Sequence, residues 1–385
     1  MKRLWWALLT FTLGTNLSSP LYPLYQTKFH MSAADISLLY LVYALFLVPS
    51  LLLLGPLADR LGRKALIIPS ILLMVVATGF FAFATQPWQL FVGRGFQGLA
   101  IGGFLGSCTA LMLEQTDPKN YRFAVVLASF TTMVGMGLGP GLAGVLIQYV
   151  PLNPFQFPFL LHILLLLLDL IAVLSVKETF QASLQQRFQI ALGVPQQVRR
   201  PFWSLIAPTS FFMYAFSGTA FALIPTFVVS ILNIHNLAMS GVLLFLLMLI
   251  GGIAQLLVAR VDLFVINNWG VILTVIGAFV LVSAAPTHSP LVLFLGMMIE
   301  GCGSGFLYKG SFGLAGQIST HKQRSQIVSS YYVAGYSGLI ITVLLVGRLT
   351  SAIGLTYAFL CLAIALTLLG CVILFAARQI KATIS

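Results

Sequence analysis

Long hydrophobic runs separated by short polar breaks dominate the chain. The run FLLHILLLLLDLIAVLSV, residues 159–176, is apolar on every side of a helix. About 20 such residues cross the hydrocarbon core of a bilayer. A transmembrane β-barrel would instead alternate apolar and polar positions. The pattern therefore predicts membrane-spanning helices.

Charge clusters and Pro, Gly or Asn breaks divide the chain into twelve predicted spans. We expect an all-α polytopic membrane protein with twelve transmembrane helices in two six-helix bundles. The N-terminal bundle comprises residues 1–176, the cytoplasmic central loop 177–204 and the C-terminal bundle 205–385. The spans cover approximately residues 4–25, 35–57, 65–85, 88–113, 122–148, 157–176, 205–231, 238–259, 268–285, 291–315, 326–347 and 355–376.

Composition supports this class and indicates an orientation. Hydrophobic residues make up 59% of the chain and charged residues 7%, which is more apolar surface than a soluble core buries. With both termini cytoplasmic, all but four of the 20 Lys and Arg residues lie on the inner side. The exceptions are Lys28, Arg94, Lys309 and Arg348. This bias follows the positive-inside rule, so a multi-pass protein of the cell (inner or plasma) membrane accounts for the net charge of +12, and no nucleic-acid partner is expected.

The two halves repeat each other. LFVGRGFQG at 90–98 matches LFLGMMIEG at 293–301, and FTLGT in the first span matches AFSGT in the seventh at almost the same offset. Three matches in register, counting Lys119 with Lys322, indicate duplication. Two related bundles place the expected substrate site between them, near the middle of the membrane.

The loop GPLADRLGRK, residues 55–64, combines glycines, an acid and bases. Glycines permit close helix approach and a tight turn, an aspartate can accept from amides at a helix N-terminus, and Arg63 can pair with an acid across the loop. Basic anchoring by the positive-inside rule is the alternative, but it leaves Asp59 and the glycines unexplained.

This loop resembles the signature between helices two and three of the major facilitator superfamily, at every signature position. The resemblance implies contacts with span eleven and with Glu114, in a latch that stabilises the outward-open state. The expected latch residues are Gly55, Asp59, Arg60, Gly62, Arg63, Lys64 and Glu114.

Two further motifs narrow the resemblance. LFVGRGFQGLA, residues 90–100, is similar to the family's fourth-helix motif, with Ala100 in place of its last Gly. GMGLGPGLAG, residues 135–144, resembles the fifth-helix motif of the drug:proton antiporter (multidrug efflux) branch, with Ala143 in place of one Gly. That branch is associated with export. An ordinary face of small packing residues is the alternative for the matching positions Gly135, Gly139, Pro140 and Gly144.

Charged groups inside spans are costly and usually functional. We expect Arg94, Glu300 and Asp169 to serve proton coupling, with Glu300 the first candidate carrier because it matches Gln97 in the repeat and should face the central cavity. The alternatives are a permanently protonated Glu300 that holds helices together, and a structural hydrogen bond for Asp169. Lys309 can extend to the cytoplasmic interface. The first span has no acid, although many relatives of this branch carry one there.

Polar and aromatic residues at cavity depth are candidates for substrate contact. Such a lining suits amphipathic, including cationic, compounds, although packing is the alternative role for aromatic residues in membrane helices. The expected cavity residues are Asn16, Gln97, Phe211, Tyr214, Gln255, Tyr308, Tyr332 and Tyr336.

Together these features predict a secondary active transporter that exports a small amphipathic compound, drug-like or metabolite, in exchange for protons by alternating access. A proton-independent facilitator or uptake carrier, or a lipid flippase of the same fold, is the first alternative. An intramembrane enzyme would need a nucleophile and a base, and His162 is the only imidazole in the spans. We expect no catalysis, no cofactor and no metal site, since the four cysteines and five histidines show no ligand spacing. The expected partners are the small molecule, protons and the lipid bilayer, and the expected state is a monomer.

Overall fold

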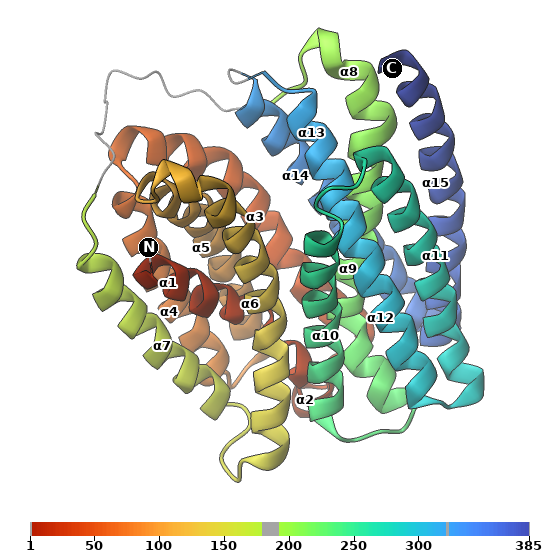
Figure 1. The fold of residues 1–385 in the computed structure, drawn as a ribbon. Helices are drawn as coiled ribbons and strands as arrows, with labels where there is room; N and C mark the ends of the chain where they lie inside the picture. Colours follow the sequence, from red (N-terminus) through yellow and green to blue (C-terminus); the bar gives the residue numbers. More distant parts are fainter. Residues whose placement is uncertain (1, 179–191, 321–322, 385) are drawn as a thin grey trace. The chain divides into compact units, whose positions relative to one another are not determined.

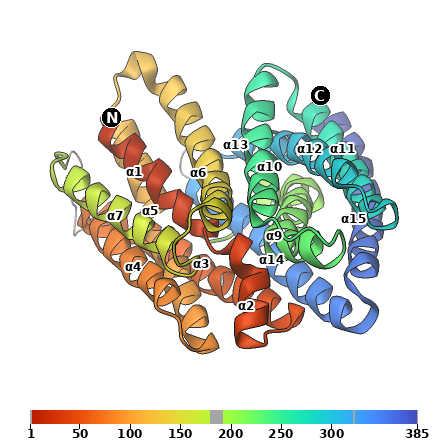
Figure 2. The same ribbon diagram turned by 90° about the horizontal axis from the view of Figure 1, so that it is seen from below.

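A computed structural model describes residues 2–178, 192–320 and 323–384, and in this part of the chain all regular structure is helical (Figures 1 and 2). The contacts divide it into two compact units. Unit 1 comprises residues 1–30, 42–190 and 236–245, and unit 2 comprises residues 31–41, 191–235 and 246–385. The predicted all-α fold is confirmed.

Unit 1 contains the first helices of the chain and the beginning of a later one. α3 starts in unit 2 and continues in unit 1, whereas α10 starts in unit 1 and continues in unit 2. The helices up to the central loop are α1 (Lys2–Leu13), η1 (Gly14–Asn16), η2 (Ser19–Leu21), α2 (Tyr22–Phe29), α3 (Ala33–Leu61), α4 (Lys64–Ala82), α5 (Pro87–Glu114), η3 (Pro118–Asn120), α6 (Tyr121–Tyr149) and α7 (Phe157–Leu174).

Unit 2 contains the helices after the central loop. Two of its long helices include π-helical turns, η5 and η6. The bounds are η4 (Gln196–Val198), α8 (Arg199–Pro201), η5 (Phe202–Ile206), α9 (Ala207–Ser230), α10 (Leu237–Leu257), α11 (Leu263–Thr287), α12 (Pro290–Leu307), η6 (Tyr308–Phe312), α13 (Gly313–Gln317), α14 (Arg324–Ile353) and α15 (Leu355–Ile384).

The first predicted span is not a continuous helix. Eleven helices in the described residues are long and apolar enough to cross a membrane, and they correspond to the other predicted spans. The first span instead breaks into α1, two 3₁₀ turns and α2. Pro20 and Pro23 lack the N–H groups that would bond the carbonyls of Asn16 and Ser19 in an α-helix, so the sequence itself accounts for the break.

Close packing at glycines repeats in the two units. A Cβ atom added to Gly98 of α5 would lie 2.3 Å from the backbone oxygen of Tyr43 in α3. At the matching Gly301 of α12, an added Cβ atom would lie 2.9 Å from the backbone oxygen of Leu247 in α10. The two halves of the predicted repeat therefore use the same glycine for the same kind of helix contact.

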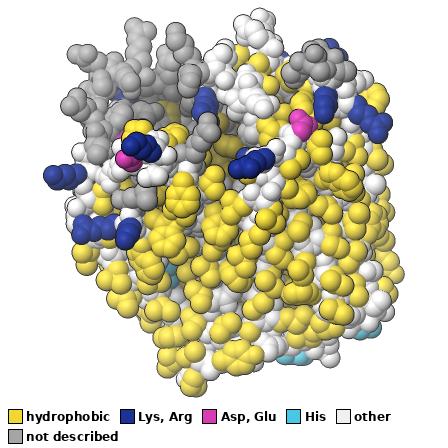
Figure 3. Space-filling model, in the orientation of Figure 1, with side chains coloured by type: hydrophobic (Ala, Val, Ile, Leu, Met, Phe, Trp, Pro, Cys, Tyr) yellow, Lys and Arg dark blue, Asp and Glu magenta, His cyan; other side chains and the backbone are white. Residues whose placement is uncertain are grey.

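The outer helix faces are apolar. Ile171 of α7 is 65% exposed and Leu368 of α15 is 66% exposed. On the visible face of each unit, hydrophobic side chains cover most of the surface and charged side chains are few (Figure 3). Apolar exposure on this scale is stable in lipid and unfavourable in water. The chain is a multi-pass membrane protein.

Candidate functional site

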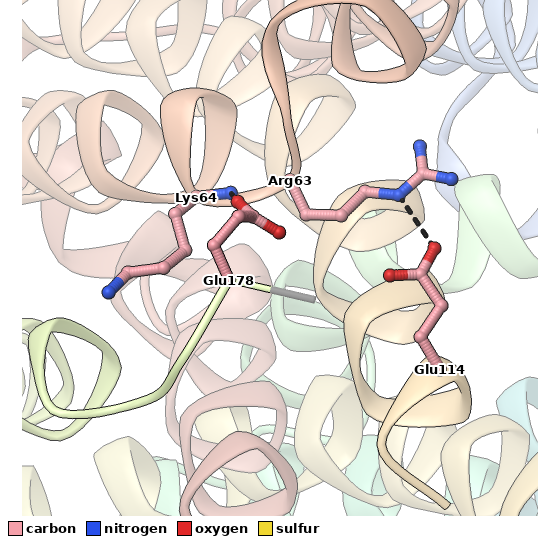
Figure 4. A network of polar contacts seen from close by, with 4 residues as sticks. All are labelled: Arg63, Lys64, Glu114 and Glu178. Carbon is pink, nitrogen blue, oxygen red and sulfur yellow. Dashed lines mark hydrogen bonds and ion pairs between the residues drawn. The ribbon is translucent and has the colours of Figure 1, made fainter. Parts of the chain in front are cut away.

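The loop between α3 and α4 forms an ion pair with the end of α5. The Arg63 Nε atom donates to Glu114 Oε1 at 3.1 Å, and the two side chains are 13% and 29% exposed (Figure 4). Arg63 immediately precedes α4 and Glu114 is the last residue of α5, so the pair joins the ends of both helices. The structure thus brings together the base and the acid that the sequence analysis proposed as partners.

The same loop also binds the chain after α7. The backbone N–H of Lys64 donates to Glu178 Oε2 at 2.8 Å, which places a carboxylate at the first residue of α4 (Figure 4). A negative charge at a helix N-terminus is stabilising. The Lys64 Nζ atom donates to the backbone oxygens of Leu174 and Val176 at 3.0 and 2.7 Å. Glu178 lies in the polar loop without a motif of its own, so the sequence does not mark it as a partner of this turn.

The glycines of the loop differ in their roles. Gly62 has φ +100°, a conformation that favours glycine and makes the turn between α3 and α4 possible. Gly55, by contrast, has no described atom within 4 Å of an added Cβ atom, so the close helix approach expected there is not found among the described residues. The Asp59 side chain lies outside the described residues. Arg60 is half-buried.

Arg94 of α5 binds the break in the first span. It is 0% exposed, and its guanidinium donates to the Thr15 backbone oxygen at 2.9 Å and to Ser18 Oγ at 2.8 Å. It also donates to Tyr22 Oη, and to Gln97 Oε1 at 3.0 Å. A planar guanidinium suits several acceptors at fixed angles. This network ties α5 to a backbone oxygen and two hydroxyl groups of the broken first span.

Gln97 and Asn16 lie in the same buried region. Gln97 Nε2 donates to the Gly14 backbone oxygen at 3.2 Å. Gln97 is 1% exposed and Asn16 is 4% exposed. In unit 1 the first span packs directly on this face of α5, and the substrate contact expected of the two residues stays a prediction. The break itself accounts for this packing, because its backbone oxygens come within reach of the α5 side chains.

Asp169 and His162 of α7 form a second buried cluster with α1. Thr10 Oγ1 donates to Asp169 Oδ2 at 2.5 Å, and His162 Nε2 lies 3.1 Å from the Thr10 backbone oxygen. His162 Nδ1 lies 3.3 Å from Thr78 Oγ1 of α4. The cluster joins three helices, which is the structural alternative that the sequence analysis gave for Asp169. The sequence marked His162 only as the one imidazole in the predicted spans.

Glu300 is buried at the interface of α12 with α11. Its side chain is 0% exposed, and a Cβ atom added to Gly277 of α11 would lie 3.0 Å from the Glu300 Cβ atom. Neither carboxyl oxygen has a hydrogen-bond partner among the described residues. The orientation of Glu300 toward a central cavity stays a prediction, and within unit 2 the residue packs against α11. Gln97 accepts a hydrogen bond from Arg94 one turn before it. Glu300 lacks such a donor, because Met297 occupies the position that corresponds to Arg94 in the repeat.

The glycines of α6 make two sets of contacts. Cβ atoms added to Gly135 and Gly139 would lie 2.0 Å from Thr12 Oγ1 and from the Leu13 backbone oxygen, so both face the first span. One Cβ atom added to Gly144 would lie 2.8 Å from the Leu237 backbone oxygen, at the start of α10. A side chain at any of these positions would push a helix away. Close packing therefore accounts for the spacing of these small residues.

Pro140 belongs to the contact with α10. A Cβ atom added to Gly241 would lie 2.3 Å from the Pro140 backbone oxygen. The proline lies inside α6, where its ring removes one helical hydrogen bond. The motif thus combines a weakened helix with glycines on both of its packed faces.

Several predicted cavity aromatics gather in unit 2. The rings of Tyr214 and Tyr336 lie 5.0 Å apart, joining α9 to α14. The Tyr308 and Phe312 rings of η6 are stacked at 5.4 Å, and the Phe312 ring lies 6.1 Å from that of Tyr332. Centroid distances of 4.5–7 Å are typical of favourable aromatic pairs. Phe312 was not among the predicted residues, and only its spacing of four from Tyr308 marks it in the sequence.

Two further predicted contact residues, Phe211 and Gln255, also belong to unit 2. The backbone oxygen of Phe211 would lie 2.3 Å from a Cβ atom added to Gly338, so Phe211 takes part in the packing of α9 on α14. Gln255 of α10 is buried. A hollow of about 340 Å³ opens elsewhere, in unit 1 between α3 and α5, and none of the predicted cavity residues lines it. Its lining residues are Phe46, Phe91, Val92, Gly95 and Phe96.

Curated relatives match parts of the chain. The class H tetracycline resistance protein of Pasteurella multocida is 30% identical over 162 residues, 41% of this chain and 40% of that protein. The quinolone resistance protein NorA of Staphylococcus aureus is 26% identical over 176 residues, 45% of each chain. In both cases the match spans less than half of the relative's length.

Solved structures match the whole fold. A transporter of the POT family in complex with 5-aminolevulinic acid has a TM-score of 0.80 at 13% identity, over 98% of this chain and 96% of that one. A bacterial homologue of the lysosomal transporter Spinster, in an inward-facing occupied conformation, has a TM-score of 0.77 at 14% identity, over the same shares. Identities this low establish the fold alone.

The family model described as Major Facilitator Superfamily matches residues 4–308. The matched region includes the loop after α3, the Arg94 motif of α5 and the glycine motif of α6, whose geometry is described above. On this evidence the chain belongs to the Major Facilitator Superfamily.

Proposed function

We propose that this protein is a secondary active transporter that exports small amphipathic compounds in exchange for protons. In this proposal both termini are cytoplasmic, residues 1–176 and 205–385 form the two bundles around a central loop, and a monomer works by alternating access. The relatives that support export are the tetracycline resistance protein of Pasteurella multocida and the quinolone resistance protein NorA of Staphylococcus aureus.

The burial of Glu300 is the observation that supports proton coupling. A carboxyl group that is 0% exposed and has no partner among the described residues is most stable in its neutral form. An ionised carboxylate there would need water or a cation. Antiport requires a group that takes up a proton in one state and releases it in another. Glu300 also lies in the same unit as the aromatic rings described above.

The aromatic cluster supports the class of substrate. The rings of Tyr214, Tyr308, Phe312, Tyr332 and Tyr336 offer stacking and cation–π contacts rather than fixed charges. Amphipathic or cationic organic compounds suit such a surface, whereas the described residues offer no basic cluster there for a polyanion. The latch role of Arg63 and Glu114 is part of the same proposal, because their ion pair joins helix ends beside the turn.

Reconstituted transport tests the proposal. Purified protein in liposomes is given an imposed pH gradient and a panel of fluorescent lipophilic cations and neutral amphiphiles. We expect accumulation of some panel members on the acidic side, and its loss when an ionophore collapses the gradient. Accumulation that is unchanged without the gradient would contradict antiport and favour a facilitator. The lack of any acid in the first span is the observation that favours this second candidate.

A further inference from the structure

Buried polar groups without partners line the interface between α11 and α12. Asn267 and Thr274 of α11 and Glu300 of α12 are each 0% exposed. Both oxygens of Glu300, the hydroxyl of Thr274 and both amide atoms of Asn267 have no hydrogen-bond partner among the described residues. Buried polar atoms are normally bonded, and several orphaned atoms on one interface point to a partner such as bound water.

The groups face the opposite helix. A Cβ atom added to Gly303 of α12 would lie 2.5 Å from Thr274 Oγ1, so this hydroxyl points at α12. One turn away, the Glu300 Cβ atom lies 3.0 Å from a Cβ atom added to Gly277 of α11. Residues 274 and 277 share one face of α11, as do 300 and 303 of α12. Thr274 and Glu300 therefore belong to one seam.

The seam continues toward the beginning of α11. The Asn267 Cβ atom lies 2.9 Å from a Cβ atom added to Gly310, one helical turn beyond Leu307. Between these levels the Leu307 Cγ atom lies 2.8 Å from a Cβ atom added to Gly270, and Leu307 is fully buried. A π-helical turn, η6, starts directly after Leu307, and such turns are frequent at functional sites. Leu307 is the apolar narrow point of the seam.

No fixed charge compensates Glu300 from the neighbouring helices. Three neighbouring helices are described throughout, namely α9, α10 and α11. They contain no Asp, Glu, Lys, Arg or His, and Tyr214 is their one titratable side chain. The helix that holds Glu300 has three further titratable side chains after it, those of Cys302, Tyr308 and Lys309. Lys309 is nine residues further along, or about 13 Å at a rise of 1.5 Å per residue. The protonation of Glu300 therefore depends on what reaches it along the interface.

We propose that the α11–α12 seam (Asn267, Thr274 and Glu300) holds internal water that carries protons between Glu300 and the end of α11 that bears Asn267. Each water oxygen accepts one proton and releases another, so no side chain has to carry the proton along the seam. Displacement of Leu307 opens the route. The use of this proton for export rests on the proposed function, whereas the presence of the water does not. The proton would then have a route separate from the aromatic cluster.

Infrared hydrogen–deuterium exchange tests the route directly. The carbonyl band of the protonated Glu300 carboxyl is identified as the parent spectrum minus that of Glu300→Gln, in protein reconstituted in liposomes. On transfer to D₂O, we expect the band to shift rapidly in the parent. In Thr274→Val we expect exchange slower by about tenfold, the scale of one lost hydrogen bond. Asn267→Leu should slow it as well.

Two control variants distinguish loss of the proton route from a general effect of altered packing. Thr274→Ser keeps the hydroxyl, and its exchange rate should stay near that of the parent. Thr219→Val removes a buried hydroxyl of α9 that already bonds the Ala215 backbone oxygen at 2.8 Å, and it should leave the exchange unchanged. Equal exchange in parent and Thr274→Val, or no protonated Glu300 band at any pH, would overturn the proposal.

Transport by the same variants distinguishes this proposal from the proposed function. Net transport driven by a pH gradient needs proton transfer, whereas exchange of labelled for unlabelled substrate at equal pH does not. Thr274→Val should slow the first and spare the second. Rapid exchange at Glu300 that depends on Thr274, in a parent without proton-driven transport, would support the seam and contradict antiport. Proton-driven transport without dependence on Thr274 would do the reverse.

Discussion

Arg94 of α5 donates to the backbone oxygen of Thr15 at 2.9 Å, at the point where the first span ceases to be an α-helix. The span is broken by its prolines, and the buried guanidinium also bonds the Ser18 hydroxyl within the broken segment. A cation of this depth is thus part of the fold of unit 1 as well as a candidate for coupling. The two roles make different predictions.

Arg94→Lys should destabilise the protein although it keeps the charge. One ammonium group cannot reach Thr15, Ser18 and Gln97 with the geometry of a guanidinium. We expect a loss of about 3 kcal/mol in the free energy of unfolding, the cost of breaking a buried charged network. Thermal unfolding in detergent measures it, with Arg348→Lys as the exposed control. An unfolding temperature equal to that of the parent would show that the network contributes little.

Gly139→Ala and Gly106→Ala should have opposite effects. The new methyl group at Gly139 would meet the Leu13 backbone oxygen at 2.0 Å, whereas Gly106 has no described atom within 4 Å. Overpacking typically costs about 1–3 kcal/mol. Replacement of an unhindered helical glycine by alanine gains about 0.5–1 kcal/mol. Unfolding temperatures of the two variants decide the matter, and the same sign for both would contradict the packing of α6 on the first span.

The ion pair between Arg63 and Glu114 should contribute little to stability. Both side chains are partly exposed, so a double-mutant cycle with Arg63→Ala and Glu114→Ala should give a coupling energy of about 0.2–1 kcal/mol that falls with added salt. A latch role predicts a larger effect on transport than on stability. Transport rates of the single variants, and their recovery in the charge-swapped double variant, measure that role. Transport at the parent rate in both single variants would contradict it.

Asp169→Asn should preserve both folding and coupling. The asparagine oxygen can still accept from Thr10, and the carboxyl of Asp169 belongs to a cluster of three helices. We expect proton-driven transport within about twofold of the parent, because a neutral hydrogen bond at this site keeps most of its value. Asp169→Leu, which removes the acceptor, should lower the unfolding temperature. Loss of coupling in Asp169→Asn would instead make Asp169 a proton carrier.

The sequence predicted the class of fold because its signal is long and redundant. Eleven of the twelve spans follow from continuous apolar runs, and the pairing of Arg63 with Glu114 follows from a motif. The break in the first span was missed, since hydropathy does not change there. Only the two prolines, each removing one backbone donor, mark it.

The side-chain environment of the buried charges could not be predicted from spacing. Arg94 and Gln97 are three residues apart on a helix and so share one face, but this spacing could not show that the broken first span covers that face. Glu300 was placed by its repeat position, whereas its environment depends on Gly277 of α11, a distant residue. Glu178 has no regular pattern around it. Contacts between distant segments depend on how the helices pack. The hydrophobic periodicity of one sequence does not show which distant helices meet.

Proton movement on addition of substrate tests the central claim most directly. Liposomes with a pH-sensitive dye inside receive a transported compound from the panel, and parent, Glu300→Gln and Asp262→Asn are compared. Asp262 is an exposed carboxyl group at the start of α11, and asparagine preserves its helix cap. We expect proton movement in the parent and in Asp262→Asn, and none in Glu300→Gln. Substrate transport without proton movement in the parent, or undiminished proton movement in Glu300→Gln, would contradict the account.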